Sequence, residues 1–177
     1  LIRYPKIKGN KGKVVNAPLT TPDILPSLLG LTNIDIPKDI EGENLAALIQ
    51  NPDPNADRAA LVMNVAPFGA NYKDQPYRGI RTKQYTYAVT PKGPSMFYDN
   101  DKDPYQQNNL LGKPEFEGIQ KDLDDKLQQQ LQKIGDEVRP RAYYMEKWGY
   151  KFDDSRRAIN WWDWKEGTGT VQSPKKL

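Results

Sequence analysis

The feature that most constrains the fold is an amphipathic pattern between Pro114 and Ile134. Six apolar residues recur there at intervals of three or four: Phe116, Ile119, Leu123, Leu127, Leu131 and Ile134. This spacing places the apolar side chains on one face of an α-helix. Gly135 follows and suits the left-handed conformation that ends many helices. A helix with one apolar face needs a partner layer, so the rest of the chain must supply one.

Short runs of β-type residues lie upstream of this helix and are candidates for the partner layer. They cover Ala60–Val65, Tyr77–Thr82, Tyr85–Thr90 and Met96–Asp99, with turns between them. Runs of this length are typical of an antiparallel sheet. We therefore expect an α+β fold, in which a small antiparallel sheet is packed by the long C-terminal helix.

A second helix is expected near the amino terminus, where Thr21 is followed by Pro22 and Asp23. Threonine is a favoured N-cap, proline fits the first helical position, and aspartate interacts well with the positive end of the helix dipole. Asn33 suits a left-handed C-cap. Between them runs an apolar stripe, which we expect to be buried on one side: Ile24, Leu28 and Leu31, flanked by Leu25 and Leu29. Residues 43–50 favour another short helical turn.

The amino-terminal stretch is incomplete by itself. Leu1–Pro5 has the pattern of a short strand, and a loop rich in lysine and glycine follows. A lone strand needs a sheet, and the chain does not begin with Met, so we interpret Leu1 as an internal position of a longer protein. We divide the chain into the end of a larger α/β domain (residues 1–55), a sheet-plus-helix subdomain (residues 56–138) and an aromatic-rich tail that wraps back on the domain (residues 139–177).

The aromatic residues of the tail support this last assignment. Its tyrosines and tryptophans are Tyr143, Tyr144, Trp148, Tyr150, Trp161, Trp162 and Trp164. Such density favours a segment that packs on the domain. In the alternative interpretation, the last three tryptophans stack on sugar rings, as in carbohydrate-binding modules.

Charge and residue usage exclude several classes of function. The 26 basic and 23 acidic residues are mixed along the chain and give a net charge of +3, so we expect no nucleic-acid partner. No apolar run approaches the roughly 20 residues that cross a bilayer, so we expect no membrane span. Cysteine is absent, which excludes disulfides and thiolate sites, and histidine, the commonest general base near neutral pH, is absent too.

Separated stretches of the chain resemble, in the same order, the carboxy-terminal third of sulfatases of the alkaline phosphatase-like superfamily. Leu1–Pro5 looks like the strand that follows the last catalytic lysine of that family, and Thr21–Leu29 looks like its D-I-x-P-T-L-L helix. Glu41–Leu45 is similar to its G-x-S-L turn. Tyr77–Tyr87 resembles the R-x-I-R-T-x-x-Y-K-Y hairpin, and Phe97–Pro104 resembles L-Y-D-L-x-x-D-P.

The resemblance implies that the parent protein is a sulfatase, a sulfuric ester hydrolase in which a formylglycine hydrate attacks sulfur with the help of calcium. The family's nucleophile, calcium ligands and catalytic lysine and histidine would all lie upstream of Leu1. We therefore predict no catalytic residue, metal ligand or cofactor within this chain, whose partner would be the N-terminal catalytic part of the same protein. The resemblance also implies a sulfate ester substrate, such as a sulfated glycan, and a periplasmic or secreted location.

Two other functions stay open at this point. The chain could be a non-catalytic module that binds an anionic glycan through its basic loops or its tryptophans. The parent could also be a phosphodiesterase or a phosphonate hydrolase, since these enzymes share the superfamily. The motifs within this chain do not separate sulfate from phosphate.

Four residues are candidates for substrate binding: Arg78, Arg81, Asn64 and Tyr72. The two arginines lie three residues apart on an expected strand, so their side chains point to opposite faces and only one can face a cleft. That arginine could hold a carboxylate or sulfate in a bidentate fork, or both arginines could be salt-bridge partners inside the sheet. Asn64 and Tyr72 lie on a run, residues 63–77, that could form a substrate rim or an ordinary surface loop.

Three alternating carboxylates, Asp99, Asp101 and Asp103, have the spacing of hard-cation ligands. The sequence lacks the downstream glycine and bidentate glutamate of a calcium loop. We therefore interpret them as an Asx-type turn and predict no metal site there.

Overall fold

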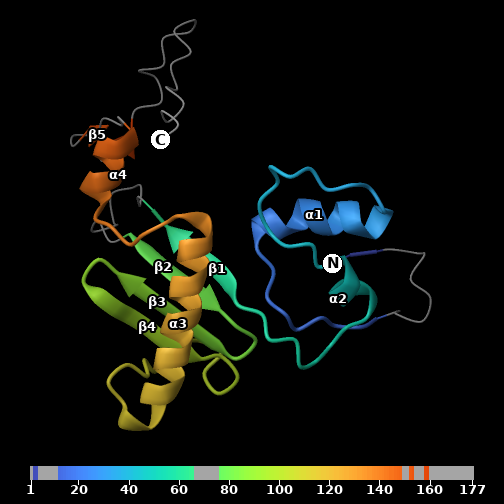
Figure 1. Ribbon diagram of the computed structural model, residues 1–177. Helices are drawn as coiled ribbons and strands as arrows, with labels where there is room; N and C mark the ends of the chain where they lie inside the picture. The colour runs from blue at the N-terminus through green and yellow to red at the C-terminus, as the bar shows by residue number, and fades with distance from the viewer. Residues whose placement is uncertain (1, 4–11, 66–75, 149–151, 154–157, 160–177) are drawn as a thin grey trace, which may run out of the picture.

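Figure 1 shows the computed structural model of the chain, which describes residues 2–3, 12–65, 76–148, 152–153 and 158–159. The elements are α1 (Thr21–Thr32), α2 (Ala46–Gln50), β1 (Ala60–Asn64), β2 (Tyr77–Arg81), β3 (Tyr85–Thr90), β4 (Gly93–Asp99), the 3-10 helix η1 (Pro114–Phe116), α3 (Glu117–Ile134), α4 (Arg141–Trp148), β5 (Phe152–Asp153) and β6 (Ala158–Ile159). None of the helices within the described residues is long and apolar enough to cross a membrane.

The main sheet has the strand order β1-β2-β3-β4, and every neighbouring pair is antiparallel. This confirms the antiparallel sheet expected from the sequence, although β4 begins at Gly93 instead of Met96. Ile80 lies opposite Tyr87, and Tyr87 lies opposite Phe97. Because directly paired residues share a face, these three side chains form a row across the sheet.

Helix α3 packs along that face, as Figure 1 shows, and closes the apolar core. Leu123, Leu127 and Leu131 are its buried residues, at the predicted spacing. The rings of Tyr87 and Phe97 meet edge to face with centroids 6.2 Å apart, a favourable geometry for aromatic pairs. The helix ends at Gly135, which has φ +64°. The α+β architecture is therefore confirmed.

Helices α1 and α2 form a separate unit beside the sheet (Figure 1). The N-cap of α1 is Thr20, one residue before the predicted Thr21, and Asn33 ends the helix with φ +62°, as expected. The turn before α2 packs on the start of α1 at Gly42. Gly42 has φ +93°, and a side chain there would collide with the carbonyl group of Pro22, so only glycine fits.

The prediction that the apolar stripe of α1 is buried is wrong within this chain. Leu31 is buried, but Ile24 is 46% exposed, Leu25 50% and Leu28 46%. The inward face of α1 carries other residues, namely Asp23, Pro26, Ser27 and Leu31. That face is turned toward the 43–45 segment because Asp23 and Ser27 hydrogen-bond to its backbone.

Helix α4 was missed by the sequence analysis because residues 141–148 carry no apolar stripe at helical spacing. Its only sequence signal is Pro140, which stands directly before the first helical residue. Trp161, Trp162 and Trp164 lie outside the described residues, as does most of Leu1–Pro5, and the described Ile2 and Arg3 have no regular structure.

Candidate functional site

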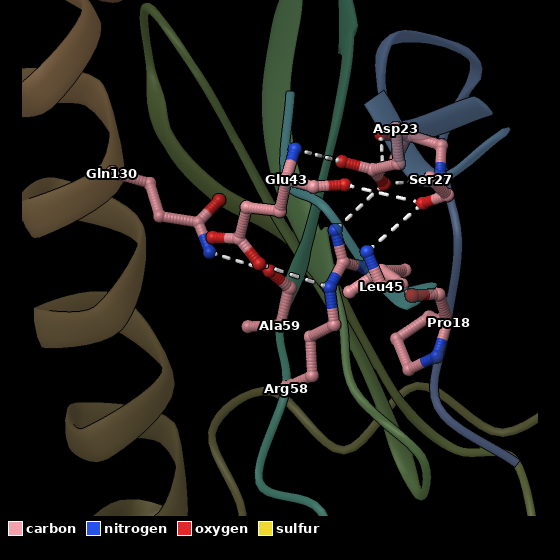
Figure 2. Close-up of polar contacts among 9 residues, drawn as sticks. Pro18, Asp23, Ser27, Glu43, Leu45, Arg58, Ala59 and Gln130 are labelled. Atoms are coloured by element: carbon pink, nitrogen blue, oxygen red, sulfur yellow. Dashed lines mark hydrogen bonds and ion pairs between the residues drawn. The ribbon is translucent and has the colours of Figure 1, made fainter. Parts of the chain in front are cut away.

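The first polar cluster centres on Arg58, which lies just before β1 and reaches into the α1–α2 unit (Figure 2). Its Nη2 lies 2.6 Å from Asp23 Oδ2 in α1, and its Nε lies 3.2 Å from Glu43 Oε2. Its Nη1 donates to the carbonyl oxygen of Pro18. The Arg58 side chain is 11% exposed and that of Asp23 is 3% exposed, so this ion pair is largely shielded from water. One guanidinium therefore binds three segments of the helical unit.

The carboxylate of Asp23 is satisfied on both oxygens. Thr20 donates to Oδ2 through its backbone N–H and its hydroxyl, each at 2.7 Å, and the backbone N–H of Glu43 donates to Oδ1 at 2.9 Å. Burial by itself raises the pKa of Asp23, but the hydrogen bonds from Thr20 and Glu43 and the charge of Arg58 together hold it below its ordinary value of 3.8. The carboxylate therefore stays ionised at neutral pH.

The same region is connected to the sheet through the residue after Arg58. Gln130 of α3 donates from Nε2 to the carbonyl oxygen of Ala59 at 2.5 Å, as Figure 2 shows. Two neighbouring residues thus connect to different parts of the structure: the Arg58 side chain binds the helical unit, and the Ala59 carbonyl accepts from α3. No local pattern in the sequence indicates a role for Arg58, because its partner Asp23 lies 35 residues away.

The second polar cluster centres on Arg78 in β2, one of the predicted substrate-binding residues. Its side chain is fully buried. It forms a two-point pair with Asp136, Nε to Oδ2 at 2.5 Å and Nη2 to Oδ1 at 3.2 Å, and Nη2 also donates to Tyr144 Oη at 2.9 Å. Burial raises the pKa of Asp136, but the hydrogen bonds from Arg78 and from the backbone of Glu137 bring it below 3.8. This placement matches the interpretation of Arg78 as an internal salt-bridge partner.

Arg78 also marks the end of the sheet at which β1 stops and β2 begins. Its Nη1 donates to the carbonyl oxygens of Asn64 at 3.4 Å and Tyr77 at 3.1 Å. The predicted site residue Asn64 thus contacts Arg78 through its backbone and is partly exposed. Tyr72 lies outside the described residues.

Arg81 lies on the opposite face of β2 and is exposed, as the strand alternation predicted. Its Nη1 donates to Thr86 Oγ1 at 3.0 Å and to Asn100 Oδ1 at 3.1 Å. Gln106, with φ +55°, donates to the same two oxygens. Arg81 and Arg78 therefore do not meet in one site, because they lie on opposite faces of the sheet.

The three alternating carboxylates form a turn, as interpreted from the sequence. Asp99 Oδ1 accepts the backbone N–H groups of Asp101 and Lys102 at 3.1 and 3.2 Å, and Asp103 Oδ2 accepts that of Asn108 at 2.7 Å. These are Asx-type interactions. Among the described residues, no group of three or more acidic, histidine or cysteine side chains could hold a metal ion.

An open groove of about 700 Å³ lies between β3 and α3. The hydroxyl of Tyr87 donates to Asp124 Oδ1 at 3.0 Å there, and burial raises the pKa of Tyr87 well above its ordinary value. The groove is also lined by Glu117, Asp136 and Glu137, with Lys121 as a basic residue. Its carboxylates make it a poor site for an anionic ligand.

A third cluster lies on the exposed side of α4. Tyr143 is 38% exposed, and its hydroxyl donates to Glu137 Oε1 at 2.9 Å. The guanidinium carbon of Arg139 lies 5.6 Å from the centre of the Tyr143 ring, and Lys147 Nζ lies 5.7 Å from it. Both distances are within the range of cation–π attraction. This tail contains several tyrosines, and no sequence pattern indicated which of them would face outward.

The chain that carries these polar clusters matches known proteins over most of its length. Residues 1–133 match the family described as N-sulphoglucosamine sulphohydrolase, C-terminal. The chain is 63% identical over 174 residues to an ulvan-active sulfatase of Formosa agariphila, covering 98% of this chain and 34% of that protein. It is 30% identical to an N-acetylglucosamine-6-O-sulfatase of Bacteroides thetaiotaomicron, over 70% of this chain and 23% of that protein.

The fold also resembles that of a solved sulfatase structure. The solved structure of a 2-O GAG sulfatase superposes with a TM-score of 0.55 and 25% identity, over 70% of this chain and 27% of that one. The chain thus spans about a third of the length of the sulfatase to which it is 63% identical, and less of the others. The order of its motifs, the sheet packed by α3 and the match over residues 1–133 lead to one conclusion: this chain belongs to the sulfatase family of the alkaline phosphatase-like superfamily and corresponds to its C-terminal part.

Proposed function

We propose that the parent protein is a sulfatase that releases sulfate from a sulfated polysaccharide of the ulvan type, and that this chain completes its substrate cleft. The observation that carries the proposal is the 63% identity, over 98% of the chain, to a sulfatase named as active on ulvan. That identity supports a shared substrate class, and we assign the chemistry itself to residues outside this chain.

The family implies calcium and formylglycine, and the described residues do not fit either group. A calcium ion takes six to eight oxygen ligands, but Asp99 and Asp103 direct theirs to backbone N–H groups of their own turn. The chain has no cysteine, none of its serines begins the S-x-P-x-R motif that carries the modified residue in this family, and histidine is absent too. The nucleophile and the metal ligands of the parent are therefore assigned to its other part.

The partner of this chain is the N-terminal catalytic part of the same protein, and α1 supplies the contact surface. Ile24, Leu25 and Leu28 project side by side from the outer face of α1, each about half exposed. Because each side chain is already about half buried, its complete burial would stabilise an interface by up to about 1.5 kcal/mol. The proposed boundary at residue 55 follows from this surface, because residues 1–55 carry it and the sheet and α3 do not.

The substrate-binding residues remain proposals at this stage. Arg81 is the arginine available to an anionic group, since it is exposed and makes no ion pair among the described residues. Asn64 and Tyr72 are proposed for the substrate rim on the strength of their position in the chain. Arg78 is a positioning residue. Its buried guanidinium binds the end of β1 and the start of β2, and the proposed rim connects these two strand ends.

A polymeric substrate also favours a location outside the cytoplasm, and we retain the periplasmic or secreted assignment as part of the proposal. Fractionation of the native host, followed by detection of the parent protein in each fraction, tests it. Detection in the cytoplasmic fraction alone would contradict it.

The decisive experiment uses the full-length parent and measures sulfate release from ulvan, turnover of a generic aryl sulfate and turnover of the matching aryl phosphate and phosphonate. We expect sulfate release from ulvan and preference for the aryl sulfate. Preference for phosphate or phosphonate would favour the phosphodiesterase or phosphonate hydrolase alternative. If the 177-residue chain alone binds ulvan as tightly as the parent, and the parent releases no sulfate, the binding-module alternative holds.

A further inference from the structure

Arg81 is a cation without an ion pair on the face of the sheet that α3 leaves open. Its neighbour Ile80 belongs to the core under α3, and successive side chains of a strand point to opposite faces. The Arg81 side chain is exposed, and among the described residues it makes no ion pair. Arg58, Arg78 and Arg139, in contrast, are each paired with an aspartate or a glutamate. The charge of Arg81 is therefore not balanced by the described part of the chain.

Neutral oxygens hold the Arg81 side chain in place. Its Nη1 donates to Thr86 Oγ1 at 3.0 Å and to Asn100 Oδ1 at 3.1 Å. The amide of Asn100 has a fixed orientation, because its Nδ2 donates to the carbonyl oxygen of Gln84 at 2.8 Å and its Oδ1 accepts the Thr86 hydroxyl at 3.0 Å. Hydroxyl and amide oxygens carry no net charge. They therefore orient the guanidinium without neutralising it.

These contacts leave one edge of the Arg81 guanidinium open. Both hydrogen bonds start from Nη1, and within the described part of the chain Nε and Nη2 have no partner. These two nitrogens donate in parallel, a geometry that matches two oxygens of a carboxylate or a sulfate. Arg78 uses the same edge for Asp136, with Nε on Oδ2 and Nη2 on Oδ1. Arg81 thus presents the edge with which Arg78 binds a carboxylate, on the other face of the strand.

Gln106 completes the network around Arg81. Its φ of +55° lies in the left-handed region, which residues other than glycine rarely adopt. Its Nε2 donates to Thr86 Oγ1 at 3.1 Å and to Asn100 Oδ1 at 2.8 Å, the two oxygens that Arg81 also binds. Backbone strain of this kind persists where the surrounding contacts impose it, and it is frequent at functional sites. The side chain next to Arg81 is therefore a neutral amide, where a carboxylate would pair with the guanidinium.

The acidic residues near the network do not take the place of such a partner. Asp99 is 3% exposed and lies on the opposite face, because strand alternation groups it with Phe97 of the core. Asp103 Oδ2 accepts a backbone N–H group of its own turn. Asp101 is exposed and stands next to the exposed Lys102. None of these three described carboxylates forms an ion pair or a hydrogen bond with Arg81.

We propose that Arg81 is a specificity-determining residue that binds an oxyanion group of the polysaccharide, a sulfate or a carboxylate, through its Nε–Nη2 edge. Asn100 and Gln106 are positioning residues that hold this edge open. The inference deepens the proposed function and rests on it, because it names the group that recognises the polymer away from the cleaved bond. One charged fork on the sheet affects affinity for the polymer and leaves the turnover of a small ester unchanged.

The first test compares R81Q and R81K in the full-length parent. R81Q removes both the charge and the fork, and we expect the KM for ulvan to rise by about fivefold to tenfold at unchanged kcat. R81K keeps the charge without the two-point geometry, so it should recover only part of the loss. Both constants for an aryl sulfate should stay unchanged in both variants. An unchanged KM for ulvan in R81Q overturns the proposal.

A second test closes the open edge without removing Arg81. Q106E places a carboxylate in a side chain of the same size beside the guanidinium, and we expect the KM for ulvan to rise about threefold to fivefold. The matched control is Q107E, which adds the same charge at the next residue, an exposed one, and should change the KM by less than about twofold. If Q107E raises the KM as much as Q106E does, general charge repulsion explains the effect and the positioning role of Gln106 is overturned.

Two further measurements identify the occupant of the fork. The thermal midpoint of the full-length R81Q variant should equal that of the wild type. A lowered midpoint at an unchanged KM would assign Arg81 to a contact with the rest of the parent and overturn the subsite. Binding to desulfated ulvan and to carboxyl-reduced ulvan separates the two oxyanions, because the derivative that no longer distinguishes wild type from R81Q lacks the group that Arg81 binds. If the parent releases no sulfate from any ester, the proposed function fails, whereas an unchanged KM in R81Q overturns this inference alone.

Discussion

The two helices that define this chain, α1 and α3, are built in opposite ways. Helix α3 buries its leucines against the sheet and exposes its charged residues. Helix α1 buries Asp23 and Ser27 in hydrogen bonds with the 43–45 segment and exposes Ile24, Leu25 and Leu28. Both have apolar residues at helical spacing, so the sequence pattern alone does not distinguish them.

The difference shows which part of the chain closes its own core. The sheet and α3 bury each other's apolar faces, because the row of Ile80, Tyr87 and Phe97 packs against the leucines of α3. The α1–α2 unit is held internally by polar contacts, and three apolar side chains of α1, those of Ile24, Leu25 and Leu28, stay about half exposed. The two regions are joined at Arg58, whose side chain belongs to one and whose backbone leads into the other.

The largest effect should come from the closed core. Leu127 is fully buried, and Leu127→Ala should destabilise the chain by about 2–5 kcal/mol, through the lost burial and the cavity left behind. Urea denaturation measures the change in the free energy of unfolding. The matched control is Ile134→Ala on the same helix, where the side chain is 52% exposed and the cost should stay within about 1 kcal/mol. Equal losses at the two positions would contradict the assigned core.

The connection between the regions should be nearly as sensitive. Arg58→Gln leaves the buried carboxylate of Asp23 without its cation and should cost about 3 kcal/mol, whereas Lys126→Gln breaks an exposed pair with Asp57 and should cost under about 1 kcal/mol. The same denaturation experiment compares them. Because Arg58 joins the two regions, we also expect limited proteolysis of the variant to cut between residues 51 and 57 more readily. A fragment pattern identical to that of the wild type would show that the units do not depend on Arg58.

The exposed face of α1 gives a smaller effect that depends on context. In this chain Leu28→Ala should change the free energy of unfolding by no more than about 0.5 kcal/mol, since the side chain is half exposed. In the full-length parent the same change should cost about 2–3 kcal/mol, because the proposed interface buries it. The prediction is tested by the difference between the two losses in the free energy of unfolding, one measured in the chain and one in the parent. The same small cost in both would remove α1 from the interface.

The smallest effect is a pH dependence that both regions share. The pKa values of Asp23 and Asp136 lie below 3.8 in the folded state, so their contribution to stability is present above that value and is lost as the pH falls through the folded-state pKa. Denaturation midpoints measured at decreasing pH should therefore fall in the acid range. Asp23→Asn should flatten this fall, because it removes one of the two carboxylates whose pKa is lowered in the folded state. A wild-type profile that stays flat in acid would contradict both assignments.

Much of the fold could be predicted from local patterns. The strand runs, the spacing of the leucines in α3 and the left-handed caps at Asn33 and Gly135 depend on residues close together in the chain, and the structure confirms them. Helix α4 escaped because it lacks an apolar stripe, and it is held by the hydroxyl of Tyr144. The alternation rule separated Arg78 from Arg81 correctly, but it could not say which of them is buried.

The sequence by itself determined the strands of the main sheet, the helices α1 and α3, the family that the motifs resemble and the caps at Asn33 and Gly135, since these depend on spacing within a few residues. Only the tertiary structure decided that Arg58 meets Asp23, that Arg78 meets Asp136 and Tyr144, and that α1 exposes Leu25 and Leu28. Such contacts join residues 35 to 66 positions apart. Such a contact forms when the gain from pairing a charge exceeds the cost of removing that charge from water. Both quantities depend on how the helices and the sheet pack around the charge, and a local sequence pattern does not contain that information.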